Sequence, residues 1–305
     1  MVYDVVIIGG GPAGLTAAIY GKRAGLSVLV VNDSPQSGGQ ILTTYEVDNY
    51  PGLPKIGGME IGQKFREHAD NFEAEFATGR VSSIVKEENI FKIVTRKVTY
   101  EAKTVIIATG AGHRHLGAPG EETFNGMGVS YCATCDGAFF KEKVTAVVGG
   151  GDVALEDAIF LARTSSKVYL IHRRDEFRGA KVLQEQVRAN EKIECVMDST
   201  VKEIGGDKKV EYVTTVNKFT NEETKYSVDG VFIAVGIMPN TANIEGLPKM
   251  DEAGYIIADE TCETSIPGMF AAGDVRTKQL RQVITSAADG ANAITSVERY
   301  LINNA

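Results

Sequence analysis

The residues of this chain best suited to covalent chemistry are two cysteines, Cys132 and Cys135, in the segment YCATCDG. Two residues separate them, and an acidic residue, Asp136, follows the second directly. A C-x-x-C pair can serve as a redox-active dithiol or as half of a zinc site. In a dithiol the attacking species is a thiolate, and a position at the start of a helix lowers the pKa of a thiol. Whether the pair is a redox-active dithiol or half of a zinc site depends on which residues the rest of the chain supplies.

A zinc site would need two more ligands at suitable spacing. The other cysteines, Cys195 and Cys262, are solitary and far apart, so only His113 and His115 could complete such a site. The sequence therefore favours a redox-active dithiol without a metal. Cys195 and Cys262 look like ordinary strand or turn residues, and the two histidines look like surface residues, so we assign none of them a role.

The bulk properties indicate a chain long enough for two ordinary domains. The 305 residues, 43% of them hydrophobic, are enough for two cores. A net charge of −8 argues against nucleic acid as a partner. A strand predicted from Tyr3 leaves no room for a secretory signal, and no apolar run is long enough for a bilayer. We therefore expect a cytoplasmic protein without a membrane partner.

The elements that must position the dithiol form a unit that occurs twice. Within 5–18 a β-branched run is followed by Gly-x-Gly-x-x-Gly and a helical pattern, and 145–158 repeats this with alanine as the last small residue. This is the dinucleotide-binding fingerprint, in which pyrophosphate rests on the helix N-terminus. One such fingerprint is weak evidence, but two in the right context indicate two nucleotide sites.

The second unit lies inside the first. Apolar strands ending in Ala-x-Gly are predicted at 104–112 and 230–238, with a further strand at 268–275. The tail contains no new fingerprint and ends in a long helix at 282–304, so it completes the first unit. We predict an α/β fold of two Rossmann-like, three-layer domains, the second inserted in the first, with segments 1–112, 113–241 and 242–305. The chain would cross between them within 110–120 and 236–248, which are rich in the Gly, Pro and Asn of linkers.

Arginines indicate the nucleotide of the inserted unit. The strand after its fingerprint helix ends in HRRDEFR, which carries Arg173, Arg174 and Arg178 where NAD-binding proteins place an acid on the ribose. Guanidinium groups match a 2′-phosphate, whereas a carboxylate would repel it. The sequence therefore favours NADPH. In the first unit the equivalent strand ends in Asn32 and Asp33, of which Asn32 could bind a ribose hydroxyl.

The order of the motifs resembles a known family. GGGPAG, GGQ, VDNYPG, ATG, CATCDGAFF, GGGDVALEDA, HRRDEFR, VGIMPNT and AAGDVRTKQLRQV follow one another as in bacterial-type low-molecular-weight thioredoxin reductases, along essentially the whole chain. The resemblance implies an FAD domain built from both ends of the chain, an inserted NADPH domain with the redox-active cysteines, and a homodimer. It also implies a thioredoxin or thioredoxin-like protein as the acceptor of electrons.

The resemblance also implies site residues. The FAD contacts would be Gly9, Gly11, Pro12, Ala13, Gly39, Gln40, Asn49, Thr109, Gly110, Asp274, Arg281, Gln282 and Val283. The NADPH contacts would be Gly151, Asp152, Val153, Ala154, His172, Arg173, Arg174 and Arg178. At Val153 the chain departs from the family, which usually has a hydroxyl-bearing residue there.

The implied catalytic residues are Cys132, Cys135 and Asp136. Asp136 would exchange a proton with a thiol, although aspartate is also a favoured helix N-cap and this one could cap instead. The expected activity is NADPH-dependent reduction of a disulfide through FAD, with rotation of the inserted domain between two states. A nucleotide-sensing protein with a metal-clipped loop is the alternative from a different class.

Overall fold

The structure of the chain is a computed structural model that describes residues 1–44, 47–242 and 244–304. Asn243 and Ala305, which fall in the predicted third segment, lie outside the described residues. The chain divides into two compact units, one of Met1–Gly112 with Met238–Ala305 and one of His113–Ile237. The second unit is thus inserted in the first.

The first unit is built on a seven-stranded sheet with the order β3-β2-β1-β6-β5-β4, in which β17 pairs with β6. The strands β1, β2, β3, β6 and β17 pair in parallel, and β4 and β5 are antiparallel additions. Their bounds are β1 Val2–Ile8, β2 Val28–Asn32, β3 Glu75–Thr78, β4 Val81–Glu87, β5 Ile90–Thr95, β6 Thr99–Ile107 and β17 Met269–Ala271.

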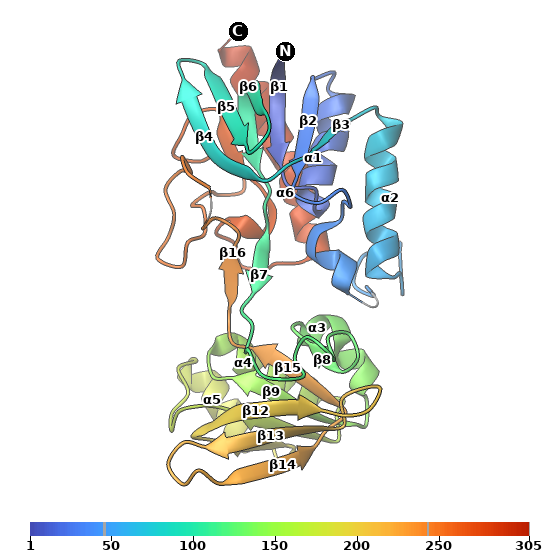
Figure 1. Ribbon diagram of the computed structural model, residues 1–305, viewed down its shortest axis with the longest axis vertical. Coiled ribbons are helices and arrows are strands. Elements are labelled where there is room, and N and C mark those ends of the chain that lie inside the picture. Colours follow the sequence, from blue (N-terminus) through green and yellow to red (C-terminus); the bar gives the residue numbers. More distant parts are fainter. Residues whose placement is uncertain (45–46, 243, 305) are drawn as a thin grey trace. The chain divides into compact units, whose positions relative to one another are not determined.

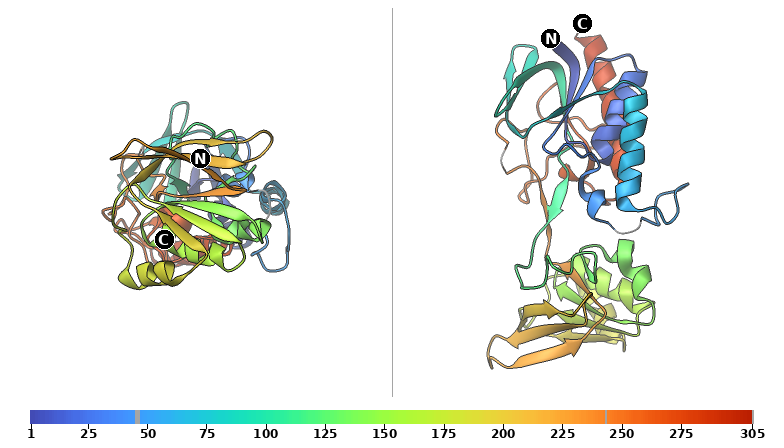
Figure 2. Two further views of the ribbon diagram at one scale, coloured as in Figure 1. Left: turned by 90° about the horizontal axis from the view of Figure 1, so that it is seen from below. Right: turned by 45° about the vertical axis from the view of Figure 1, so that its right-hand side comes forward.

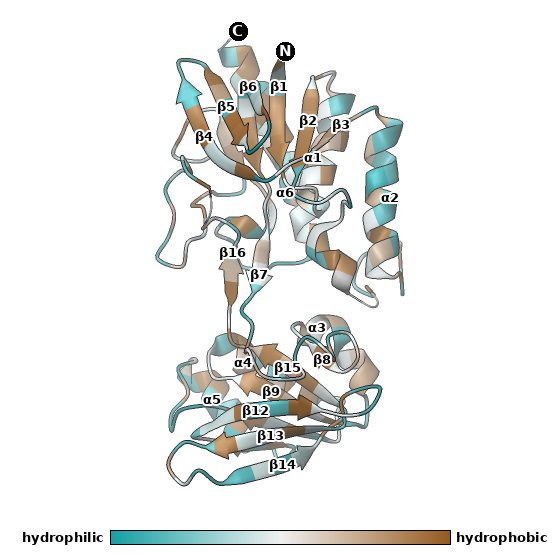
Figure 3. Ribbon diagram, viewed as in Figure 1, coloured by the Kyte–Doolittle hydropathy of each residue, from teal (hydrophilic) through white to brown (hydrophobic). Residues whose placement is uncertain are grey.

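Side chains on the two faces of this sheet enter different cores, as the alternation of a strand requires. Val5 and Ile7 of β1 contact one core with the helices, whereas Val6 and Ile8 enter the other. Helices α1 (Pro12–Arg23), α2 (Gly58–Asn71) and α6 (Val283–Asn303) lie on the same side of the sheet (Figure 2). Residues 5–8 of β1, 28–31 of β2 and 105–107 of β6 are all hydrophobic (Figure 3) and buried, which is typical of the inner part of parallel strands covered on both faces.

The second unit has three layers. Its five-stranded parallel sheet has the order β11-β10-β9-β15-β8, and its second sheet is the antiparallel β12-β13-β14 (Figure 1). One core lies between the parallel sheet and helix α4, and another lies toward the antiparallel sheet. The elements are β8 Val129–Ser130, α3 Ala133–Asp136, β9 Val144–Gly149, α4 Asp152–Ala162, β10 Lys167–Ile171, α5 Lys181–Ala189, β11 Ile193–Val196, β12 Ser199–Gly205, β13 Tyr212–Asn217, β14 Glu223–Ser227 and β15 Gly230–Ala234.

The two segments that join the units pair with each other. Strands β7 (Ala111–His113) and β16 (Ile237–Pro239) form a two-stranded sheet. Short 3-10 helices complete the fold: η1 Gly39–Thr43, η2 Gly137–Phe140 and η3 Gly273–Val275. No helix in the described part of the chain is long and apolar enough to span a bilayer.

The predicted α/β class and the insertion of one Rossmann-like unit in the other are confirmed. The predicted strand 268–275 is too long, because β17 ends at Ala271 and Asp274 lies in η3. The predicted strand 230–238 is in fact two, β15 and β16, separated at Gly236, whose φ of 120° is unfavourable for other residues.

Candidate active site

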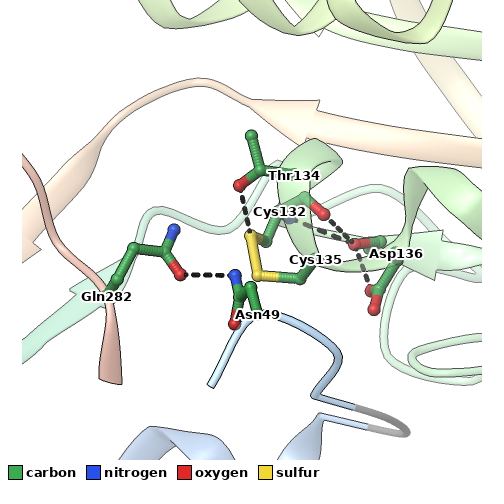
Figure 4. Close-up of a disulfide and its surroundings, with 7 residues drawn as sticks. Asn49, Cys132, Thr134, Cys135, Asp136 and Gln282 are labelled. Carbon is green, nitrogen blue, oxygen red and sulfur yellow. Dashed lines mark hydrogen bonds between the residues drawn. A yellow bond between two sulfur atoms is a disulfide. The ribbon is translucent and has the colours of Figure 1, made fainter. Parts of the chain in front are cut away.

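The cysteine pair lies at the start of a short helix. Strand β8 ends at Ser130, and Cys132 is the N-cap of α3, which contains Cys135 and Asp136. The two cysteines form a disulfide (Figure 4), with Cα atoms 5.3 Å apart. Thr134 Oγ1 lies 3.4 Å from the sulfur of Cys132. The predicted dithiol is therefore present in its oxidised form.

Asp136 follows Cys135 directly, and its carboxyl group is in a largely buried position. Its Oδ2 accepts a hydrogen bond from the hydroxyl of Ser130 at 2.6 Å, and its Oδ1 is buried without a hydrogen-bond partner among the described residues. Burial raises the pKa of Asp136, and the bond from Ser130 opposes this shift. Asp136 is the N-cap residue of η2 by position, but its side chain forms no capping hydrogen bond at α3 or η2.

The residue before the first cysteine, Tyr131, belongs to a polar cluster. Its hydroxyl donates to Glu121 Oε1 at 2.7 Å and lies 3.2 Å from His115 Nδ1, while its ring stacks on His113 at a centroid distance of 5.0 Å. Glu121 is only 2% exposed and also accepts from the backbone N–H groups of residues 116 and 117. The expectation of two surface histidines holds for His115, whose side chain is 63% exposed, but not for His113, which is half-buried.

The first glycine turn has the geometry of a phosphate cradle. Gly9 has a φ of 112°, and a Cβ there would lie 2.3 Å from the carbonyl oxygen of Ala108. A Cβ on Gly11, the N-cap of α1, would meet nothing closer than 3.9 Å, so space lies open above the helix N-terminus. The hydroxyl of Thr109 is buried with no hydrogen-bond partner among the described residues. These features fit a bound dinucleotide that supplies the missing contact.

Other predicted flavin contacts also lie in the first unit. Asp274, whose pKa is raised by burial, accepts a hydrogen bond from Ser286 Oγ at 2.9 Å. Asn49 Nδ2 donates to Gln282 Oε1 at 3.0 Å (Figure 4), which ties two segments far apart in the sequence. The guanidinium of Arg281 lies over the ring of Tyr255, 4.0 Å from its centroid. Asn32 instead supports the turn, because its side chain accepts from Gly10 N and donates to backbone carbonyls.

A buried charge cluster holds the segment that carries Asp274. The carboxylate of Asp289, 2% exposed, accepts two hydrogen bonds from Arg276, one from Lys278 at 2.9 Å and one from Gly273 N at 2.9 Å. Arg276 is itself 2% exposed. Sequence reasoning missed this cluster. Two basic residues after the GDV motif were the available signal, but they do not identify Asp289 as the partner.

The second glycine turn repeats the geometry of the first. A Cβ on Gly149 would lie 2.3 Å from Ala234 O, and nothing lies within 4 Å of a Cβ on Gly151, the N-cap of α4. The imidazole of His172 is buried against Gly150, and its Nε2 lies 3.1 Å from Glu176 O. Asp152 accepts from Ala180 N, and Val153 is 51% exposed.

The three arginines predicted to recognise a 2′-phosphate are exposed in the loop after β10. The backbone N–H of Arg178 donates to Gly150 O at 2.7 Å, which connects this loop with the glycine turn. In residues 1–44, 47–242 and 244–304, none of Arg173, Arg174 and Arg178 forms an ion pair with an acidic side chain. Their positive charges are therefore available to an anionic ligand.

The remaining cysteines do not join the site. Cys195 lies in β11, and burial raises the pKa of its thiol. Cys262 is fully buried, and burial is the main cause that raises the pKa of its thiol to about 12. Among the described residues no three His, Cys, Asp or Glu side chains gather as metal ligands.

Comparison with known proteins gives consistent results. A family model described as pyridine nucleotide-disulphide oxidoreductase matches residues 3–290. The thioredoxin reductase of Listeria innocua is 46% identical over 301 residues, which cover 98% of this chain and 94% of that protein. Among solved structures, the thioredoxin reductase of Streptococcus pyogenes is 46% identical, with 99% of both chains covered and a TM-score of 0.94. That of Lactococcus lactis, described as the FR conformation, is 42% identical at the same coverage but has a TM-score of 0.67.

Proposed function

The chain belongs to the pyridine nucleotide-disulphide oxidoreductases and within them to the thioredoxin reductases, and on this premise we propose that it passes electrons from NADPH through FAD and its own disulfide to thioredoxin. The use of a flavin and a pyridine nucleotide follows from the family. The observation that carries the proposal is the Cys132–Cys135 disulfide, followed directly in the chain by Asp136, whose Oδ1 is buried with no hydrogen-bond partner among the described residues.

The bound flavin would take two electrons from the nicotinamide and supply two electrons to the disulfide. The residues around the first glycine turn, Thr109 and Asp274 would hold it. Opening the disulfide consumes two electrons and two protons and yields two thiols. One cysteine then attacks the disulfide of the acceptor as a thiolate, and the other closes the Cys132–Cys135 bond again and releases the acceptor as a dithiol. Asp136 would accept and return the proton of a thiol.

The direct test is a coupled assay on the purified, flavin-loaded protein. We expect NADPH to bleach the flavin and oxidised thioredoxin to restore its colour, with steady NADPH oxidation. A panel of thioredoxin-like proteins would identify the acceptor. A colourless protein with stoichiometric zinc, or one that accepts electrons only from reduced ferredoxin, would contradict the proposal.

The coenzyme choice rests on the loop after β10. Replacing Arg173 and Arg178 by alanine should weaken NADPH by ~1.5–3 kcal/mol for each lost charge-assisted bond and affect NADH far less, because only NADPH carries the 2′-phosphate. Dissociation constants for both coenzymes check this. Arg188→Ala, an exposed arginine at the end of α5, is the matched control for net charge. Equal weakening of both coenzymes would show that these arginines serve another purpose.

We also propose that the inserted unit rotates between a state that brings the disulfide to the flavin and one that brings the nicotinamide there. The family resemblance supports this alternation, and one solved relative, 42% identical to this chain, is described by its name as the FR conformation. Hinges near residues 112–117 and 236–242 would absorb the motion. A cross-link that holds the disulfide at the flavin should block reduction by NADPH. Normal turnover of the locked protein would rule the rotation out.

From the family resemblance we also propose that the protein is a homodimer and that it is located in the cytoplasm. Light scattering of the flavin-loaded protein should give twice the mass of one chain. Fractionation of the source cells should place the protein with cytoplasmic markers.

A further inference from the structure

The hydroxyl of Ser130 connects the two ends of the redox segment. Ser130 ends strand β8 and is only 6% exposed. Its Oγ accepts a hydrogen bond from the backbone N–H of Cys132 at 3.1 Å and donates one to Asp136 Oδ2 at 2.6 Å. One side chain thus contacts both the first cysteine and the acid that follows the second.

The proton count of this hydroxyl restricts what it can do. A serine has one O–H donor and two acceptor lone pairs. The carbonyl oxygen of Cys132 lies 3.4 Å from Oγ, but it cannot receive the single proton while Asp136 does. The short bond to Oδ2 therefore uses the only donor of Ser130, and this donor favours the ionised form of Asp136.

The second oxygen of Asp136 is in the opposite situation. Oδ1 is buried and has no hydrogen-bond partner among the described residues. An unpaired buried carboxylate oxygen is costly, so it is the favoured place for an incoming proton. The two oxygens are therefore unequal, one fixed by Ser130 and one free to exchange a proton.

We propose that Ser130 is a positioning residue for the dithiol, which holds Asp136 by Oδ2 and leaves Oδ1 as the oxygen that exchanges a proton with the thiols. This inference rests on the proposed role of Asp136. After two electrons and two protons have opened the disulfide, Oδ1 takes the proton of the attacking thiol. It returns that proton to the sulfur that leaves the acceptor disulfide.

Other titratable groups near this segment have to be separated from Asp136. Helix α4 packs against α3 and carries Glu156 and Asp157, and burial raises the pKa of Asp157 to about 7. On the β8 side, Tyr131 is directed to Glu121 and the histidines 113 and 115. Asp157 is the main competitor, because its pKa lies in the working range of the enzyme.

The test uses the full flavin-loaded chain with Cys195→Ser as the background, because Cys195 is the other partly exposed thiol. The protein is reduced with dithiothreitol, freed of it under nitrogen and mixed with 5,5′-dithiobis(2-nitrobenzoate). The rate of thionitrobenzoate release is followed against pH. This half-reaction needs neither NADPH nor thioredoxin. Flavin absorbance and thermal unfolding confirm that each variant is folded.

Loss of the Ser130 donor removes a bond to the charged form of Asp136, so the pKa of Asp136 must rise. Ser130→Ala should therefore move the acid-side inflection of the rate upward by about one to two pH units. Ser130→Thr keeps the hydroxyl and should restore the original position. In the Asp136→Asn background ionisation of the thiol alone sets the inflection, so Ser130→Ala should no longer shift it. Asp157→Asn is the control and should leave the inflection where it is.

Three outcomes would overturn this inference alone. One is an unchanged inflection in folded Ser130→Ala, another is an equal shift in the alanine and threonine variants, and the third is a shift in Asp157→Asn. An equal shift by Ser130→Ala in the Asp136→Asn background would overturn both this inference and the proposed role of Asp136. Failure of NADPH-dependent thioredoxin reduction would contradict the proposed function alone, because the half-reaction is read independently.

Discussion

Replacing Cys132 or Cys135 by serine is expected to lower thioredoxin reduction by more than about 10³-fold while flavin stays bound and reducible by NADPH. The pair lies after the flavin in the electron path, so its loss interrupts only the last transfer. A serine hydroxyl neither forms a stable disulfide nor attacks one at neutral pH. The measurements are NADPH oxidation with thioredoxin and stopped-flow bleaching of the flavin.

Cys195→Ser is the matched control for this experiment. It removes a sulfur from the same unit, but one in β11 that is outside the disulfide. Its turnover should equal that of the unmodified protein. If either variant of the disulfide pair kept near normal turnover, the dithiol assignment would be wrong.

The second large effect is expected at Asp289. Its replacement by alanine leaves the buried cations of Arg276 and Lys278 without their shared partner, which in comparable cases costs about 3–5 kcal/mol. Asp289 also fixes Gly273, next to Asp274, so the flavin should be lost as well. Amide hydrogen exchange should show lost protection in residues 269–290, with residues 144–171 as the internal reference. Flavin absorbance gives the occupancy.

A matched control is Glu260→Gln. Glu260 lies 3.4 Å from the same guanidinium, but its side chain is 85% exposed, so screening by water leaves little to lose. The variant should keep both its flavin and its protection. If both variants lost flavin and protection from exchange equally, burial of the Asp289 carboxylate would not be the cause of the loss in Asp289→Ala.

The same cluster predicts a dependence on pH. Burial alone would raise the pKa of Asp289, but hydrogen bonds from Arg276 and Lys278 outweigh it and lower the pKa below its ordinary value of 3.8. The stabilisation is therefore complete above about pH 4 and is lost as the pH falls through the lowered pKa. In acid, the unmodified protein should lose this contribution, whereas Asp289→Ala should have none to lose.

The parts of the fold that the sequence predicted are those with a local pattern. Both glycine turns follow a β-branched run and precede a helix. The alanines of the two Ala-x-Gly strand ends, Ala108 and Ala234, have carbonyl oxygens so close to Gly9 and Gly149 that no Cβ would fit there. Ser130 could also have been found, because a serine two residues before a backbone N–H commonly accepts from it.

The remaining features depend on contacts that no periodicity encodes. Asp289 lies on the long helix α6 among polar and small residues, and only folding reveals that it meets Arg276. The pairing of Tyr131 with Glu121 likewise joins two loops whose composition is ordinary. The antiparallel strands β12–β14 alternate polar and apolar residues too irregularly to be separated from loops by sequence alone.

The insertion of the second unit within the first sets the order in which the two units can fold during synthesis on the ribosome. The inserted unit is complete at Ile237, whereas the first unit still lacks β17 and α6 at that point. At about 5–20 residues per second, the last segment, 238–305, takes several seconds more to emerge. During that interval α1 has no α6 to cover its apolar face, and the edge of β6 that later receives β17 is open. The domain that begins first is thus the last to fold, and a nascent chain stalled once residues 113–237 have emerged from the ribosome should present a finished insertion on an unfinished host.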